Sequence, residues 1–175
     1  DAYAIRKAVD MGLNFFVSNS FSKNLSLYGE RVGGLSVVCQ DEAMAELVQG
    51  QLKFTVRRIY SSPPSHGGHI VDIVMNDDAL FEEWAQEVYV MRDRIKAMRQ
   101  KLRDGLERKI PGRSFEYITK QNGMFSYTGL NAAQVASIIE DYGIYMVSNG
   151  RISVAGLNSN NIDYVANAMA DVLQR

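Results

Sequence analysis

Three polar side chains near the start of the chain, Ser20, Lys23 and Arg31, have the types and spacing that amine chemistry requires. They belong to a serine- and asparagine-rich loop and its edges, between two apolar runs, Leu13 to Val17 and Val32 to Cys39. The apolar runs indicate short buried strands, and burying an ammonium group beside them is costly. A partly desolvated lysine, however, loses its proton more easily and becomes a nucleophile.

Spacing alone leaves two interpretations of this loop open. A loop lysine such as Lys23 is more often simply solvated. In the functional interpretation, Lys23 forms a Schiff base with a carbonyl group that is held by a neighbouring anion site. Arg31 offers a guanidinium fork for a phosphate, and Ser20 offers a hydroxyl donor. The simpler alternative for Arg31 is a surface salt bridge with Glu30.

Composition restricts the class of protein. The chain has 175 residues, of which 46% are hydrophobic and 22% charged, as is usual for a globular protein of one domain or somewhat more. The formal net charge of -1 argues against a nucleic-acid binder, which normally shows a basic excess. The single cysteine excludes an intrachain disulfide, and no apolar run approaches the ~20 residues of a membrane helix. We therefore expect a cytoplasmic protein.

The apolar spacing predicts helices and strands in alternation, which is typical of an α/β fold. The expected helices span residues 1–11, 42–60, 70–75, 77–108, 131–142 and 160–173. The expected strands span residues 13–17, 32–39, 115–117, 124–128, 144–147 and 152–155. We place a domain boundary near Val90, within the longest helix.

An apolar stripe from Phe81 to Leu102 recurs at alternating spacings of three and four residues. It is compatible with a coiled coil, but the lack of matched flanking charges favours a long helix packed across a domain. A non-catalytic helical interaction module is the alternative function that such a stripe suggests. It predicts that Lys23→Ala leaves function unchanged, whereas changes at Trp84 and Met91 break a partner contact.

Four motifs follow one another over nearly the whole chain: SNSFSKNLSLYGERVGG, TVRRIYSSPPSHG, QNGMFSYTGL and SNGRISVAGLN. Together they resemble the aspartate and aromatic (tyrosine) aminotransferases, which are fold-type I pyridoxal-phosphate enzymes. LYGERVGGLSV, YSSPP and GMFSYTGL are closer to the bacterial aromatic subgroup. The resemblance implies the carboxy-terminal portion of this α/β fold. Residues 1–90 would end the large, mainly parallel-sheet domain that binds the cofactor, and residues 91–175 would form the small domain.

The resemblance also implies a role for individual residues. Lys23 matches the catalytic lysine that joins the cofactor pyridoxal 5'-phosphate in a Schiff base and later moves the substrate α-proton. Arg31 and Ser20 match groups that bind the cofactor phosphate. Arg151 matches the arginine that holds the substrate α-carboxylate, and Phe125 matches an aromatic ring beside the substrate side chain.

Two further matches lie on a segment that crosses a homodimer in the family. Arg57 matches an arginine that reaches the distal carboxylate of a dicarboxylic substrate, and Ser61 lies on the same segment. Alternatively, Arg58 points to the site instead, or both arginines lie on a solvated helix face. The implied activity is transamination between an aromatic or dicarboxylic amino acid and 2-oxoglutarate. Another fold-type I enzyme, such as a β-lyase or decarboxylase, is the close alternative.

The family pattern also predicts what this chain lacks. Family members are more than twice as long, and the group that pairs with the pyridine nitrogen lies in their amino-terminal half. We therefore expect a part of a longer enzyme that is inactive and unstable without that half. His66 and His69 have no suitable third ligand nearby, so we expect no metal. Cys39 is expected to be a small apolar core residue.

Overall fold

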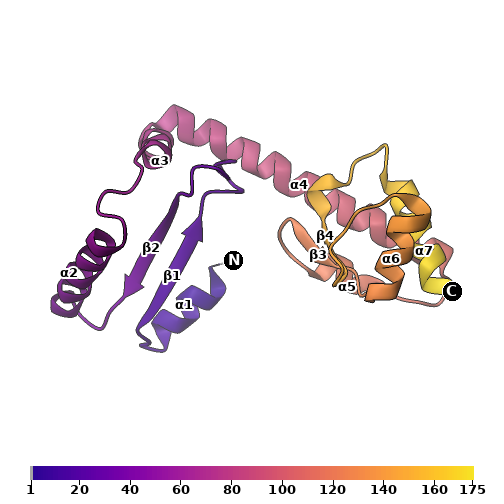
Figure 1. Ribbon diagram of the computed structural model, residues 1–175, viewed down its shortest axis with the longest axis horizontal. Coiled ribbons are helices and arrows are strands. Elements are labelled where there is room, and N and C mark those ends of the chain that lie inside the picture. Colours follow the sequence, from indigo (N-terminus) through magenta and orange to yellow (C-terminus); the bar gives the residue numbers. More distant parts are fainter. Residues whose placement is uncertain (1) are drawn as a thin grey trace. The chain divides into compact units, whose positions relative to one another are not determined.

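The computed structural model describes residues 2–175, which form two compact units, Asp1–Ala85 and Gln86–Arg175. The division falls inside the longest helix, α4 (Asp78–Lys109), which is continuous through it (Figure 1). No helix in the described part of the chain combines the length and the apolar character that a membrane span requires.

The first unit is built on a β-hairpin that follows the short helix α1 (Tyr3–Asp10). Strand β1 (Phe15–Ser20) pairs with β2 (Gly33–Val38) in antiparallel register along its whole length. This pair is antiparallel rather than parallel because its short connection contains no crossover helix, which parallel neighbours need. The hairpin sets Ser20 at its open end, directly before the loop that carries Lys23.

Neither strand of the hairpin is buried as predicted. Between residues 2 and 85 the structure buries no apolar side chain, and Phe16 and Leu35 are 66% and 54% exposed. Cys39 is half-buried and not a core residue. The expectation of strands covered on both faces is wrong here because the helices of this unit bury none of their own apolar residues and so supply no covering layer.

The two other helices of the first unit begin at different kinds of signal. Helix α2 (Glu42–Ile59) starts as predicted, with the Asp41 carboxylate accepting the Met44 N–H at 2.8 Å. Helix α3 (His66–Asn76) starts earlier than predicted and includes two glycines. Gly67 is buried, and a Cβ there would lie 2.9 Å from the Glu30 side chain, so this turn requires glycine.

Helix α4 confirms the long predicted helix. The Asp77 carboxylate accepts the N–H groups of the first turn, and the helix ends just before Pro111. In its carboxy-terminal half the apolar stripe is buried, with Met98 and Leu102 at 6% and 1% exposure. That part of the stripe therefore packs inside the chain, as expected for a helix laid across a domain.

The second unit has a true apolar core. The carboxy-terminal half of α4 is surrounded by short elements (Figure 1). These are α5 (Glu116–Lys120), β3 (Phe125–Tyr127), α6 (Ala132–Tyr142), β4 (Arg151–Ser153), the 3-10 turn η1 (Val154–Gly156) and α7 (Ile162–Gln174). Leu106, Phe115, Ile138 and Val154 are fully buried in this core. The Asn131–Gln134 capping box predicted for α6 is present.

Three of the predicted strands in the second unit need correction. Residues 115–117 lead into α5, because the Ser114 hydroxyl accepts the Glu116 N–H and starts a helical turn. Residues 144–147 form no strand, since only the Val147 N–H reaches across to β4. The strand predicted at 152–155 ends at Ser153, where the chain turns into η1.

Candidate active site

The loop that carries Lys23 is closed at its base and curled inside. The Phe21 N–H donates to the Val32 carbonyl at 3.2 Å, which extends the hairpin by one bond beyond its last strand pair. The Phe21 carbonyl accepts from the N–H groups of Leu25 and Leu27. These bonds hold the backbone around Lys23 in a fixed turn although no regular element contains it.

The side chains of Lys23 and Arg31 both lie against Tyr28. The Lys23 Nζ is 4.5 Å from the centroid of the Tyr28 ring, a cation–π distance. The Arg31 Nη1 donates to the Tyr28 carbonyl at 3.1 Å. Sequence analysis did not single out Tyr28. Its only signal was an aromatic residue in a loop that is otherwise small and polar.

Arg31 occupies a strained backbone conformation. Its φ of +53° lies in the left-handed region, which residues with a Cβ seldom adopt. Such strain is often retained where it places a functional side chain. The alternative salt bridge with Glu30 is absent among residues 2–175, so most of the Arg31 N–H donors have no protein partner there.

Ser20 lies at the other end of the same loop. Its Oγ donates to the Ser22 Oγ at 3.0 Å and accepts the Ser22 N–H at 3.2 Å. Ser22 is buried, whereas Ser20 and Lys23 are exposed. The expectation of a partly desolvated Lys23 is therefore wrong for the described residues, because nothing in the first unit covers the open end of the hairpin.

Trp84 anchors the lysine loop from α4 and was missed as a site residue. Its indole N–H donates to the carbonyl of Asn24, the neighbour of Lys23, at 2.8 Å. The Trp84 ring also lies 5.5 Å from the Phe81 ring. The helical stripe marked Trp84 as apolar, but only the tertiary structure shows that its polar edge fixes this loop.

Arg57 and Ser61 line a second feature of the first unit, a hollow of about 440 Å³ beside Leu35 of β2. Arg57 is exposed in the last turn of α2, and Ser61 follows with a φ of +58°. Arg58 instead lies 5.5 Å from the Phe54 ring on its own helix. Of the two arginines, Arg57 is therefore the one that shares a hollow with Ser61.

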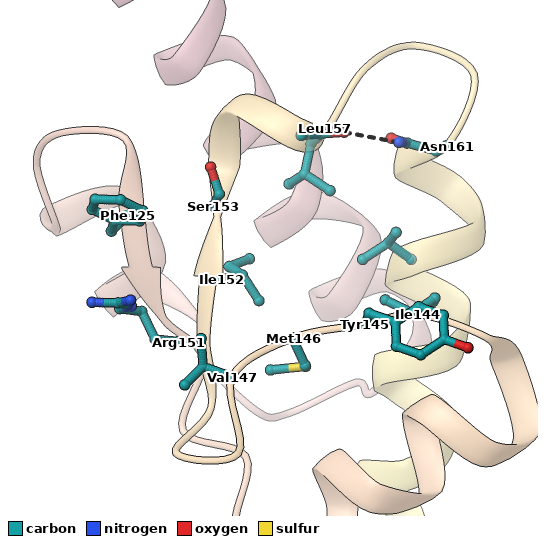
Figure 2. Close-up of a pocket in the computed structure, with 12 residues that line it drawn as sticks. Phe125, Ile144, Tyr145, Met146, Val147, Arg151, Ile152, Ser153, Leu157 and Asn161 are labelled. Atoms are coloured by element: carbon teal, nitrogen blue, oxygen red, sulfur yellow. Dashed lines mark hydrogen bonds between the residues drawn. The ribbon is translucent and has the colours of Figure 1, made fainter. Parts of the chain in front are cut away.

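The second unit places Arg151 directly against Phe125. Strands β3 and β4 pair in antiparallel register, with Tyr127 opposite Arg151 and Phe125 opposite Ser153. This register brings the Arg151 Cζ to 4.8 Å from the centroid of the Phe125 ring. Figure 2 shows both side chains on one side of β4, with Ile152 on the other.

The turn before β4 depends on Gly150. Its φ is +84°, and a Cβ at this position would lie 2.6 Å from the carbonyl oxygen of Leu130. The Asn149 side chain accepts the Arg151 N–H at 3.1 Å and completes the turn. Among residues 2–175 the Arg151 guanidinium has no ion pair and no hydrogen bond, so its donors are free for a ligand carboxylate.

A hollow of about 540 Å³ adjoins the Arg151 strand, and its lining is mostly apolar. Ile144, Met146 and Ile152 contribute side chains to it (Figure 2). The Asn161 side-chain amide donates to the Gly156 carbonyl at 2.9 Å and ties the start of α7 to η1 at one edge. The cationic and apolar parts of this site thus come from the two faces of one short strand.

The predicted site residues fall into three groups in the structure. Lys23, Ser20 and Arg31 share the lysine loop. Arg57 and Ser61 share the hollow beside β2, and Phe125 and Arg151 share the β3–β4 ribbon of the second unit. That these groups meet in one active site remains a prediction. His66 and His69 are exposed in the first turn of α3, and no metal-binding group of three ligands forms within residues 2–175.

Comparison with known proteins decides the family. A sequence profile described as aminotransferase class I and II matches residues 1–169. This chain belongs to the class I and II aminotransferase family. It is 56% identical over 173 residues to the aromatic-amino-acid aminotransferase of Escherichia coli (strain K12), covering 99% of this chain and 44% of that relative. The sequence-based family resemblance is confirmed.

Solved aminotransferase structures show the same fold. A psychrophilic aromatic amino acid aminotransferase from Psychrobacter sp. B6, cocrystallised with aspartic acid, has a TM-score of 0.95 and 71% identity. It covers 99% of this chain and 44% of that structure. The aromatic-amino-acid aminotransferase from Burkholderia pseudomallei, covalently bound to pyridoxal phosphate, has a TM-score of 0.92 and 51% identity over 98% of this chain and 43% of its own. The predicted fold-type I class is confirmed, and this chain spans less than half the length of these relatives.

The lysine loop has the donor set that pyridoxal 5'-phosphate needs. The cofactor requires an amine for its aldehyde and several donors for its phosphate. Within residues 2–175 the Lys23 amine has no ion pair, Arg31 keeps N–H donors in reserve, and Ser20 adds a hydroxyl. The residues present therefore fit this aminotransferase cofactor.

Proposed function

We propose that this chain is part of an aminotransferase that exchanges an amino group between an aromatic or dicarboxylic amino acid and 2-oxoglutarate. The observation that carries the proposal is the lysine loop. It presents an amine on Lys23 and a guanidinium on a strained Arg31, both against Tyr28. Two like charges on one loop suit an anionic ligand that carries a carbonyl group, and pyridoxal 5'-phosphate is such a ligand.

Each loop residue has a task in this proposal. Arg31 and Ser20 bind the phosphate of pyridoxal 5'-phosphate, since a guanidinium and a hydroxyl match its oxygens. The bound cofactor supplies an aldehyde for the amine and a ring that withdraws electrons from the substrate α-carbon. Lys23 holds the cofactor between turnovers and moves the proton from that α-carbon during turnover. Trp84 and Tyr28 keep the Lys23 loop in place.

Arg151 orients the substrate. Its free guanidinium donors bind the α-carboxylate as a bidentate pair, which fixes the α-C–H bond toward the lysine. Phe125 lies beneath the cation and borders the substrate side chain. We further propose that Arg57 and Ser61 act across a homodimer on the distal carboxylate of a dicarboxylic substrate. An aromatic substrate requires Arg57 to move aside or to be screened.

The proposal includes partners outside the described residues. The chain would work with the amino-terminal half of the same enzyme and with a second copy in a homodimer. Residues 1–90 would complete the large cofactor-binding domain, and residues 91–175 would form the small domain. The lack of buried apolar side chains between residues 2 and 85 supports a covering partner there. A cytoplasmic location stays a prediction of the sequence.

The test uses the assembled enzyme with Lys23→Ala, and Lys7→Ala as a matched control on the exposed face of α1. Amino-group transfer from phenylalanine and from aspartate to 2-oxoglutarate is followed by product analysis. We expect Lys23→Ala to lower kcat by more than about 10²-fold, as for the loss of a general base, and Lys7→Ala to change it little. Borohydride reduction should attach the cofactor to Lys23 alone.

The outcomes separate the alternatives. Retained transfer in Lys23→Ala would refute the proposal and favour the non-catalytic module. Cofactor attachment at Lys23 without transfer to 2-oxoglutarate would favour a β-lyase or decarboxylase. Comparable kcat/KM for phenylalanine and aspartate would place the enzyme in the aromatic subgroup.

A further inference from the structure

Arg99 is a buried cation in the second unit with no anionic partner. It lies on α4 and is only 3% exposed. Among residues 2–175 no carboxylate lies within ion-pair distance of it. Desolvation holds the pKa of the Arg99 guanidinium below its usual range. A buried charge of this kind is expensive to keep unless its hydrogen bonds are needed elsewhere.

All the hydrogen bonds of Arg99 go to the segment that leads into β3. Its Nη atoms donate to four acceptors at 2.6 to 2.9 Å. The acceptors are the carbonyl oxygens of Ile118, Gly123 and Phe125 and the hydroxyl of Ser126. The 2.6 Å bond ends on the backbone of Phe125 itself. Arg99 therefore replaces a neighbouring strand on one side of β3.

Little else fixes β3 in place. The strand has three residues and pairs only with the three-residue strand β4. An isolated two-stranded ribbon is marginal in water. The remaining support is Gln121, whose side chain bonds the backbone N–H and carbonyl of Tyr127. The cation on α4 is thus the main link between this ribbon and the rigid core.

We propose that Arg99 is a positioning residue for substrate binding, because it sets the place of the Phe125 ring beneath the Arg151 guanidinium. The inference rests on the proposed function, in which Arg151 binds the substrate α-carboxylate. Phe125 is held at its backbone by Arg99, and its ring holds the Arg151 cation at 4.8 Å. A shift of β3 would therefore change where the carboxylate-binding donors point, although Arg99 itself never touches the substrate.

The experiment measures carboxylate binding to the assembled enzyme. The probe is 3-phenylpropionate, which has a carboxylate and a ring but no amino group, so it binds without turnover. Arg99→Lys keeps the charge but cannot reach four acceptors. We expect it to weaken probe binding about tenfold, the effect of losing one or two bonds to a charged group. Arg103→Lys is the control, since Arg103 lies one turn further along α4 and contacts Glu107 and Thr119 instead.

Two further variants keep the result decisive. Ser126→Ala removes one Arg99 acceptor and should weaken probe binding in the same direction by about two- to threefold, even if Arg99→Lys fails to fold. Arg151→Lys tests the proposed function directly. If Arg151→Lys weakens binding while Arg99→Lys and Ser126→Ala match Arg103→Lys, only the positioning role is overturned. If Arg151→Lys leaves binding unchanged, the carboxylate assignment fails and the positioning role with it.

Discussion

The contact between Gly105 of α4 and Ala166 of α7 allows a quantitative test of how the second unit is packed. Gly105 is buried, and a Cβ added there would lie 2.9 Å from the Ala166 Cβ. Real Cβ atoms do not approach so closely, and neither atom can rotate away because both are fixed to backbone. Gly105→Ala must therefore push the two helices apart.

Two opposing effects determine the change in the free energy of unfolding for Gly105→Ala. Replacing a glycine in a helix interior by alanine stabilises by about 1 kcal/mol. Overpacking a tight core costs about 1–3 kcal/mol. We expect Gly105→Ala to destabilise the second unit by about 0–2 kcal/mol, although helix propensity alone predicts stabilisation.

A double-mutant cycle isolates the steric effect. Ala166→Gly removes the opposing methyl group and costs about 1 kcal/mol in helix propensity. In the double variant the methyl group has moved across the interface, so propensities nearly cancel and no clash remains. We expect a favourable coupling energy of about 1–3 kcal/mol between the two positions.

Urea unfolding of the polypeptide 86–175, followed by far-UV circular dichroism, measures all three free energies. The slope of each transition must agree among variants, so that midpoint shifts report stability. An additive cycle, with Gly105→Ala more stable than the parent by the full propensity gain, would show that α4 and α7 are not in contact at this point. That result would refute the packing described for the second unit.

Three further predictions concern the fold and the loop. The polypeptide 86–175 should unfold cooperatively on its own, with a calorimetric enthalpy of about 60 kcal/mol, whereas 1–85 should show no transition because it buries no apolar side chain; a comparable transition in 1–85 would contradict this. Trp84→Phe removes the indole bond to Asn24 and should weaken pyridoxal 5'-phosphate binding to the assembled enzyme about two- to tenfold in an equilibrium titration; unchanged binding would show that the loop needs no such anchor. Hydrogen bonds from the Phe115 N–H and Arg103 hold the pKa of Glu107 below its ordinary value. The resulting stability is present at neutral pH and is lost as pH falls through the folded pKa, so Glu107→Gln should destabilise 86–175 at neutral pH and match the parent in acid. An equal difference at both pH values would refute the charge effect.

The sequence predicted most of what is local in this protein. Helix α6 was defined by its capping box and by the glycine that follows it, and α2 by Asp41 and the prolines after it. Such signals act through neighbouring backbone groups, so they can be read along the chain. Lys23 and Arg31 were also found, because an amine and a guanidinium in a small polar loop are conspicuous by type.

Only the tertiary structure decided how those residues are supported. Residues 144–147 look like a strand by composition, yet pairing requires a partner, and β4 faces β3 instead. Trp84 and Arg99 appeared in sequence as parts of a helical stripe and a charged face. Their roles depend on hydrogen bonds to Asn24 and Phe125, which are distant along the chain. Sequence by itself determined which groups carry the chemistry, whereas folding decided what holds them, because long-range contacts leave no periodic signal in the chain.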